Sequence, residues 1–212
     1  MTHYIENYSY PYKPRGSGAV TRTTEKLTGL SRLSHFLVGI ETIDTLIERS
    51  AVYIRDMLNV DYCRIFILAP DGHYQFKSKR PDYEKAVEKV FELVSNSKDP
   101  QRPSSLEQVL DSKARDLLGL KIRDCHWIIP LRVEQSLVGT LVLAKANSSE
   151  IDAFPLDNYY LVDLIADQLG NAVHRKQLNE QLENSSIEIV LALSKTLETR
   201  DPFSGAHSKR LA

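Results

Sequence analysis

The sequence predicts an α+β fold, in which an antiparallel sheet is covered by helices on both faces and a long C-terminal helix follows. Apolar residues alternate along the chain between helical spacing and the short, dense runs typical of strands. The strand-like runs come in two pairs, each joined by a short polar turn, which indicates hairpins. The order helix, helix, hairpin, helices, hairpin, long helix excludes a doubly wound parallel sheet.

Composition fits a globular core and excludes several classes of function. Of the 212 residues, 42% are hydrophobic, enough for one sizeable core and two small ones at most. The 27 basic and 28 acidic residues give a net charge of -1, which does not favour nucleic acid or an anionic membrane. Two cysteines are too few for a disulfide scaffold, and no apolar run resembles a signal peptide or membrane span. We therefore expect a cytoplasmic protein that binds neither nucleic acid nor membrane.

The N-terminal part predicts a tail and two amphipathic helices. Residues 1–22 are rich in tyrosine but show no periodic pattern, so we expect a flexible tail. From Thr23 to Gly39, apolar residues follow a helical period at Leu27, Leu30, Leu33 and Leu37. Thr42 is the expected N-cap of the second helix. That helix carries its apolar stripe at Ile43, Ile47, Ala51, Ile54 and Leu58.

Two hairpins with helices between them are predicted next. The first covers residues 63–79, with its turn at 70–72. Two charged helices are expected over 83–94 and 106–118, and Ser104 stands in position for a capping box of the second.

The second hairpin pairs residues 126–133 with 137–144 across a polar turn. Its second strand is almost continuously apolar. This pattern indicates a strand that is covered on both faces.

The C-terminal helical pattern is too long for one globular core. Apolar residues keep a helical period from 161 to 197, in one helix or in two with a restart at Ser185 or Ser186. The later members need a partner beyond the sheet: Leu178, Leu182, Ile189 and Leu193. That partner is either a second copy of the chain or a downstream domain. We favour a homodimer through parallel helices.

Residues 39–176 resemble a GAF domain, the fold of many small-molecule sensors. The resemblance is carried by 43–58, 59–72, 129–131, 138–143 and the exit helix 154–172. It implies a sensor domain over 23–176 and a linker helix with the start of another domain over 177–212. Members of the family bind cyclic nucleotides, tetrapyrroles or haem, or simply dimerise. Residues 82–120 depart from the usual pattern, because they predict two charged helices in place of glycine-rich material over the ligand.

Three strand residues are candidates for binding an unidentified small molecule. In domains that resemble this one, the ligand lies between the sheet and the middle helices. There, Phe66 and Trp127 would supply an aromatic wall, and Arg64 a cationic donor. Alternation places Arg64 and Phe66 on one face of their strand but leaves open which face forms a pocket. The alternative, favoured for Phe66 and Trp127, is ordinary core packing.

The run 191–212 resembles the opening of an HD-GYP domain, a family of metal-dependent cyclic di-GMP phosphodiesterases. Arg200-Asp201-Pro202, Gly205 and Arg210 match the motif, and His207 matches a metal-ligating histidine. The His-Asp pair and the Gly-Tyr-Pro segment of that family do not occur in the 212 residues. We therefore expect no cofactor in this chain, and divalent metal ions only in an HD-GYP domain beyond it.

These resemblances imply a regulatory sensor and dimerisation module of a bacterial signalling protein. Its output would be a C-terminal HD-GYP phosphodiesterase. Because two metal ions need several His and Asp ligands, one terminal histidine cannot support catalysis, and we expect no enzyme activity in this chain. The alternative is a ligand-free module that only dimerises.

Overall fold

The computed structural model describes most of the chain. The described segments are residues 17–40, 42–72, 74–75, 81–95, 112–120, 125–146 and 154–200. The expected tail therefore lies mostly outside the described residues, and His207 lies outside them as well.

A four-stranded antiparallel sheet forms the middle layer, as predicted. Its strands have the order β2-β1-β4-β3, and every neighbouring pair is antiparallel. The strand bounds are β1 Tyr62–Leu68, β2 Tyr74–Gln75, β3 Cys125–Val133 and β4 Ser136–Lys145. Both predicted hairpins are present, although the second strand of the first hairpin is short among the described residues.

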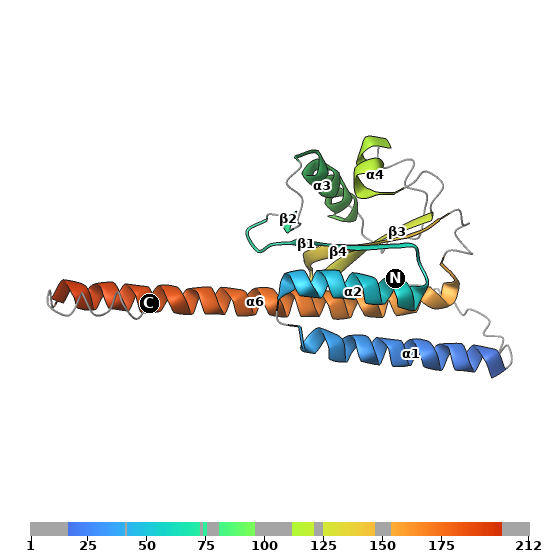
Figure 1. The fold of residues 1–212 in the computed structure, drawn as a ribbon, viewed down its shortest axis with the longest axis horizontal. Coiled ribbons are helices and arrows are strands. Elements are labelled where there is room, and N and C mark those ends of the chain that lie inside the picture. The colour runs from blue at the N-terminus through green and yellow to red at the C-terminus, as the bar shows by residue number, and fades with distance from the viewer. Residues whose placement is uncertain are drawn as a thin grey trace, which may run out of the picture.

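Five described helices cover the two faces of this sheet. Their bounds are α1 Ser17–Val38, α2 Ile43–Leu58, α3 Pro81–Ser95, α4 Ser112–Leu118 and α6 Leu156–Arg200. Figure 1 shows α1, α2 and α6 on one side of the sheet, and α3 and α4 on the other. The α+β fold with helices on both faces is thus confirmed.

The ends of α2 follow from local chemistry. Thr42 is the N-cap, because its Oγ1 accepts a hydrogen bond from the amide of Thr45 at 3.3 Å. After the last turn, Asn59 adopts a left-handed conformation with φ of 52°. The amides of Asn59 and Val60 then donate to the last carbonyl oxygens of the helix, which closes it as a Schellman motif. α1, in contrast, begins at Ser17 and not at the predicted Thr23.

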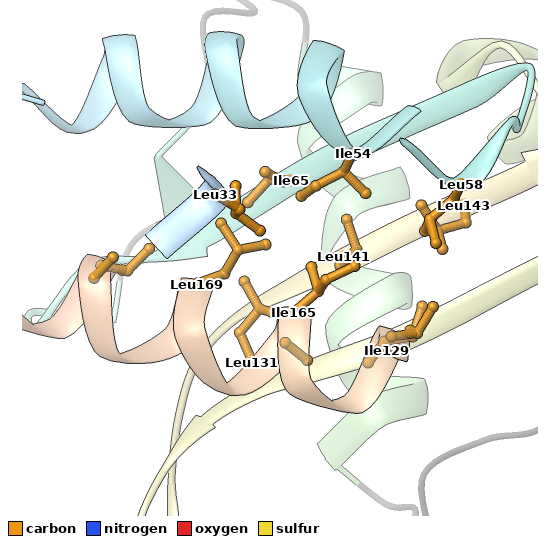
Figure 2. Close-up of a cluster of buried hydrophobic side chains, with 14 of the residues drawn as sticks. Leu33, Ile54, Leu58, Ile65, Ile129, Leu131, Leu141, Leu143, Ile165 and Leu169 are labelled. Carbon is orange, nitrogen blue, oxygen red and sulfur yellow. The ribbon is translucent and has the colours of Figure 1, made fainter. Parts of the chain in front are cut away.

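Two cores lie on opposite faces of the sheet. The larger one packs α1, α2 and α6 against the sheet, and Figure 2 shows its aliphatic side chains meeting between these elements. The smaller one packs α3 and α4 against the other face. β4 contributes to both cores and is buried without interruption from Val138 to Ala144, as its apolar sequence predicts.

Two glycines allow close backbone contacts in the larger layer. A Cβ atom at Gly139 of β4 would lie 2.6 Å from the carbonyl oxygen of Phe66. A Cβ atom at Gly170 of α6 would lie 2.9 Å from the carbonyl oxygen of Arg132 on β3. α6 therefore crosses β3 at a distance that only glycine permits.

α6 is a single helix of 45 residues that passes through Ser185 and Ser186 without a break. Ser186 does not start a new helix; it lies inside α6, and its hydroxyl donates to the carbonyl oxygen of Leu182 at 2.8 Å. Within the described residues, no helix combines the length and the apolar character that crossing a membrane requires.

Candidate functional site

The three candidate ligand residues lie on two different faces of the sheet. Arg64 and Phe66 face α3 and α4, where Phe66 belongs to the smaller core and Arg64 contacts Tyr83 of α3. Trp127 faces the other way, into the larger core. Its ring packs against Phe154 at 5.4 Å and Tyr159 at 4.7 Å between centroids. The structure therefore does not bring Trp127 together with Arg64 and Phe66.

Arg64 connects β1 to α3. Its Nη1 donates to the hydroxyl of Tyr83 at 2.8 Å, and its guanidinium lies 5.7 Å from the centre of the Tyr62 ring. The residue as a whole remains exposed. Phe66 is 2% exposed, with its ring 6.5 Å from that of Tyr83. In this structure, Phe66 packs in the core, while Arg64 joins the sheet to a helix at the surface.

Tyr62 connects the same strand to α4. Its hydroxyl donates to the carbonyl oxygen of Leu118 at 2.6 Å, just before α4 ends at Gly119. Burial raises the pKa of Tyr62, against the opposing effect of Arg64. Gly119 has a φ of 76°, and the amide of Leu120 donates to the carbonyl oxygen of Arg115. This second Schellman ending fixes the last turn of α4 over the first residues of β1.

Arg115 on α4 is the functional candidate that the sequence interpretation missed. It is 8% exposed, and its Nε and Nη1 atoms are buried without a hydrogen-bond partner among the described residues. It stands next to Ala114 and three residues before Leu118, which both belong to the smaller core. That spacing was the available signal, since it places Arg115 beside the apolar side of its helix.

A row of residues across the sheet lies on this same face. Tyr62 and His126 both pair with Ala144 of β4, one from each neighbouring strand. His126 is 2% exposed, and its neighbour in alternation, Ile128, belongs to the smaller core. The bond from Tyr62 to Leu118 brings the C-terminal end of α4 to this row.

The face covered by α3 and α4 is cationic rather than acidic in its interior. No Asp or Glu is buried in the described part of the chain. The acidic residues of α3 lie exposed, and Asp82 pairs at 3.3 Å with the exposed Lys113 of α4. Among the described residues, therefore, no buried carboxylate accompanies Arg115.

The cysteines belong to the opposite layer. Neither Cys63 nor Cys125 forms a disulfide, and both pack in the larger core. Burial raises the pKa of the Cys63 thiol to about 12, against the opposing effect of Arg55. A thiol that stays protonated is neither a nucleophile nor a metal ligand at neutral pH. In the part of the chain that the structure describes, no group of three His, Cys, Asp or Glu residues could hold a metal ion.

The sequence model of the GAF domain family matches residues 42–173, which is more than half of the chain. This chain belongs to the GAF domain family. The match spans the elements from α2 through the sheet and into the first half of α6. GAF domains are generally regulatory rather than catalytic.

Solved GAF domains share this fold at low sequence identity. A GAF domain from the phosphoenolpyruvate-protein phosphotransferase of Coxiella burnetii has 18% identity and a TM-score of 0.56, and the match covers 74% of this chain and 98% of that one. The corresponding domain from Acinetobacter has 15% identity and a TM-score of 0.54, with coverage of 71% and 93%. The A. aeolicus NLH2 GAF domain, in an inactive state, has 14% identity and a TM-score of 0.50, with coverage of 73% and 99%. A comparison with curated proteins found no match.

Proposed function

We propose that this GAF domain is the cytoplasmic regulatory input of a bacterial signalling protein, and that α6 carries its state to a C-terminal HD-GYP cyclic di-GMP phosphodiesterase. The observation that carries the proposal is the double role of α6. Its first part is built into the larger core through Leu161, Ile165 and Leu169, whereas residues beyond Gln177 extend away from the domain (Figure 1).

The coupling between the sheet and α6 is tight. Gly170 lies against the backbone of Arg132, and Gln177 donates to the carbonyl oxygen of Leu68 at 2.8 Å. β3 presents Ile128 to the α3 layer and Ile129 to the α6 layer. A shift of β3 caused by a ligand on one face would therefore move α6 on the other.

The extended part of α6 supports a homodimer. Residues 178–200 continue the helix for about 35 Å. At about 3.6 residues per turn, four exposed side chains of this part share a sector of about 60°. We call them the α6 stripe: Leu178, Leu182, Ile189 and Leu193. Their intervals of four and seven residues are those of a parallel two-helix contact, so a second copy of the chain is the partner that fits them.

Other exposed apolar residues support a downstream domain as an additional partner. Ile187, Val190 and Leu191 are exposed on other sides of α6 than the stripe. A helix that is apolar all round is normally surrounded by protein. The resemblance of residues 191–212 to the start of an HD-GYP domain supports the identity of this domain, in which His207 would be a metal ligand.

The test is the hydrolysis of cyclic di-GMP by the full-length gene product, compared with a version that lacks residues 1–176. We expect the two rates to differ at least severalfold, and only the complete protein to respond to small molecules. Equal rates under all conditions would contradict the proposal. The 212-residue chain alone is the negative control, because catalysis is assigned to the downstream domain.

A ligand-free dimerisation module is the second candidate. The observation that favours it is that Phe66 is packed in the core and that Arg64 is bonded within the domain. In that case the deletion would change dimerisation and the basal rate, but no small molecule would change the rate of the complete protein.

A further inference from the structure

Arg115 differs from every other Arg, Lys, Asp or Glu in the described part of the chain, because it alone is buried. Arginine side chains carry a positively charged guanidinium group with five N–H donors and no acceptor. A buried charge is normally paired, because the loss of hydration costs several kcal/mol per ion. Nε and Nη1 of Arg115 are buried and have no hydrogen-bond partner among the described residues. Arg115 therefore carries two buried donor atoms without an acceptor among the described residues.

We propose that Arg115 binds the carboxylate or phosphate group of a small molecule on the α3–α4 face of the sheet, and that this oxyanion is the signal that the domain senses. The proposal rests on the regulatory function proposed above and names the class of its ligand. Nε and Nη1 belong to different edges of the guanidinium group, so each edge carries a buried donor atom without a hydrogen-bond partner among the described residues. A planar guanidinium edge donates two parallel hydrogen bonds to a carboxylate or phosphate, which favours an oxyanion over a neutral or cationic ligand.

The surroundings of Arg115 agree with an anionic ligand. No carboxylate of the described residues is buried in this layer to compete for the guanidinium. Two polar side chains of this layer are already hydrogen-bonded within the domain, since Tyr62 donates to Leu118 and Arg64 donates to Tyr83. Arg64 is exposed and bonded, so it needs no further partner, whereas Nε and Nη1 of Arg115 are buried and have no hydrogen-bond partner among the described residues.

The position of Arg115 on α4 allows the binding of an anion to affect the sheet. The carbonyl oxygen of Arg115 accepts from the amide of Leu120, which closes α4. Three residues later, the carbonyl oxygen of Leu118 accepts from the hydroxyl of Tyr62 on β1. An anion on Arg115 would therefore fix α4 on the row formed by Tyr62, Ala144 and His126. This row includes both strands that lie under α6.

The test measures anion binding by the 212-residue chain. The probes are inorganic phosphate and benzoate, each compared with sodium chloride at the same ionic strength, and the readout is the melting temperature. The variants are Arg115→Met, Arg115→Lys and the control Arg55→Gln, which removes an exposed arginine that pairs with the exposed Asp56. Because ligands stabilise the state that binds them, phosphate or benzoate should raise the melting temperature of the wild type and the control by several degrees.

The variants distinguish a binding role from a structural one. Arg115→Met should abolish the anion-dependent rise while leaving the ligand-free melting temperature equal or higher, because it removes an unpaired buried charge. Arg115→Lys should weaken the apparent affinity for the anion at least tenfold. Lysine keeps the positive charge but lacks the planar guanidinium that donates two parallel hydrogen bonds. A response to phosphate alone assigns a phosphate ligand, and a response to benzoate alone assigns a carboxylate ligand.

A second measurement covers the case in which Arg115→Met does not fold. In the wild type, the Nε–H resonance of Arg115 should shift on titration with the active probe, while that of Arg55 stays in place. No rise with either probe, an equal rise in Arg115→Met, or an unmoved Arg115 resonance would overturn the proposal. None of these results affects the deletion test of the downstream phosphodiesterase, so the two proposals fail separately.

Discussion

The hydroxyl of Tyr62 donates to the backbone carbonyl oxygen of Leu118 at 2.6 Å, and this bond joins the first strand to the end of α4. Loss of the hydroxyl in Tyr62→Phe leaves that carbonyl without its donor. We expect the free energy of unfolding, measured with urea, to fall by about 1–2 kcal/mol. Tyr160→Phe is the matched control, because Tyr160 is exposed on α6 and its loss should leave stability unchanged. Equal effects of the two substitutions would contradict the role of the bond.

Gly170 should not tolerate a side chain. In an ordinary helix interior, Gly→Ala stabilises by about 1 kcal/mol. Here the added Cβ would lie 2.9 Å from the carbonyl oxygen of Arg132, so we expect Gly170→Ala to destabilise the chain by about 1–3 kcal/mol. Gly39→Ala is the control, since its Cβ would meet nothing closer than 3.9 Å. Urea unfolding measures both, and a stabilised Gly170→Ala chain would show that α6 does not press on β3.

The thiol of Cys63 should be unreactive in the folded chain. In a Cys125→Ala background, we expect a disulfide reagent at pH 8 to modify Cys63 only at the rate at which the chain opens. This follows because burial raises the pKa of the thiol to about 12, which leaves almost no thiolate. Fast modification of the folded chain would contradict this environment.

The same pKa predicts a pH dependence of stability. The folded pKa of Cys63 lies above the unfolded value of about 8.5, so the contribution of the thiol is complete below that pH. Stability should fall as the pH rises from about 9 towards about 12, because only the unfolded chain releases the proton. Cys63→Ala should flatten this decline in urea unfolding. The pKa of Tyr62 is also raised by burial, so its contribution to stability is also lost as the pH rises. Cys63→Ala should therefore reduce the slope of stability against pH without removing it.

The α6 stripe should determine the oligomeric state. We expect Leu182→Asp to weaken dimerisation at least tenfold in sedimentation equilibrium, because a charge would be buried between the two helices. Ile187→Asp is the control, since Ile187 lies on the other side of α6 and should leave the dimer intact. A wild-type chain that is monomeric at high micromolar concentration would exclude this interface.

The start of a helix or the burial of a strand was predictable from the sequence where residues close together in the chain determine it. Thr42 identifies the start of α2, and the apolar run of β4 correctly predicts burial on both faces. Strand alternation also paired Arg64 with Phe66 on one face. It could not relate them to Trp127, because that depends on the register of β3 and β4, which involves residues far apart in the sequence.

The missed parts of the candidate site depend on tertiary packing. Arg115 lies in a charged segment, and its burial beside Ala114 and Leu118 of the smaller core appears only in the folded chain. Likewise, a capping pattern at Ser186 does not reveal that α6 continues through it, where its hydroxyl bonds to the carbonyl oxygen of Leu182 inside the helix.

The most direct test of the central claim is the rate of cyclic di-GMP hydrolysis by the full-length gene product with insertions after Glu183 of α6. Two added residues rotate everything that follows by roughly half a turn, whereas seven residues nearly restore the original phase. If α6 transmits the state of the GAF domain, the two-residue insertion should change the rate at least severalfold, and the seven-residue insertion should leave it within about twofold of the wild type. Wild-type rates for both insertions would contradict transmission through α6.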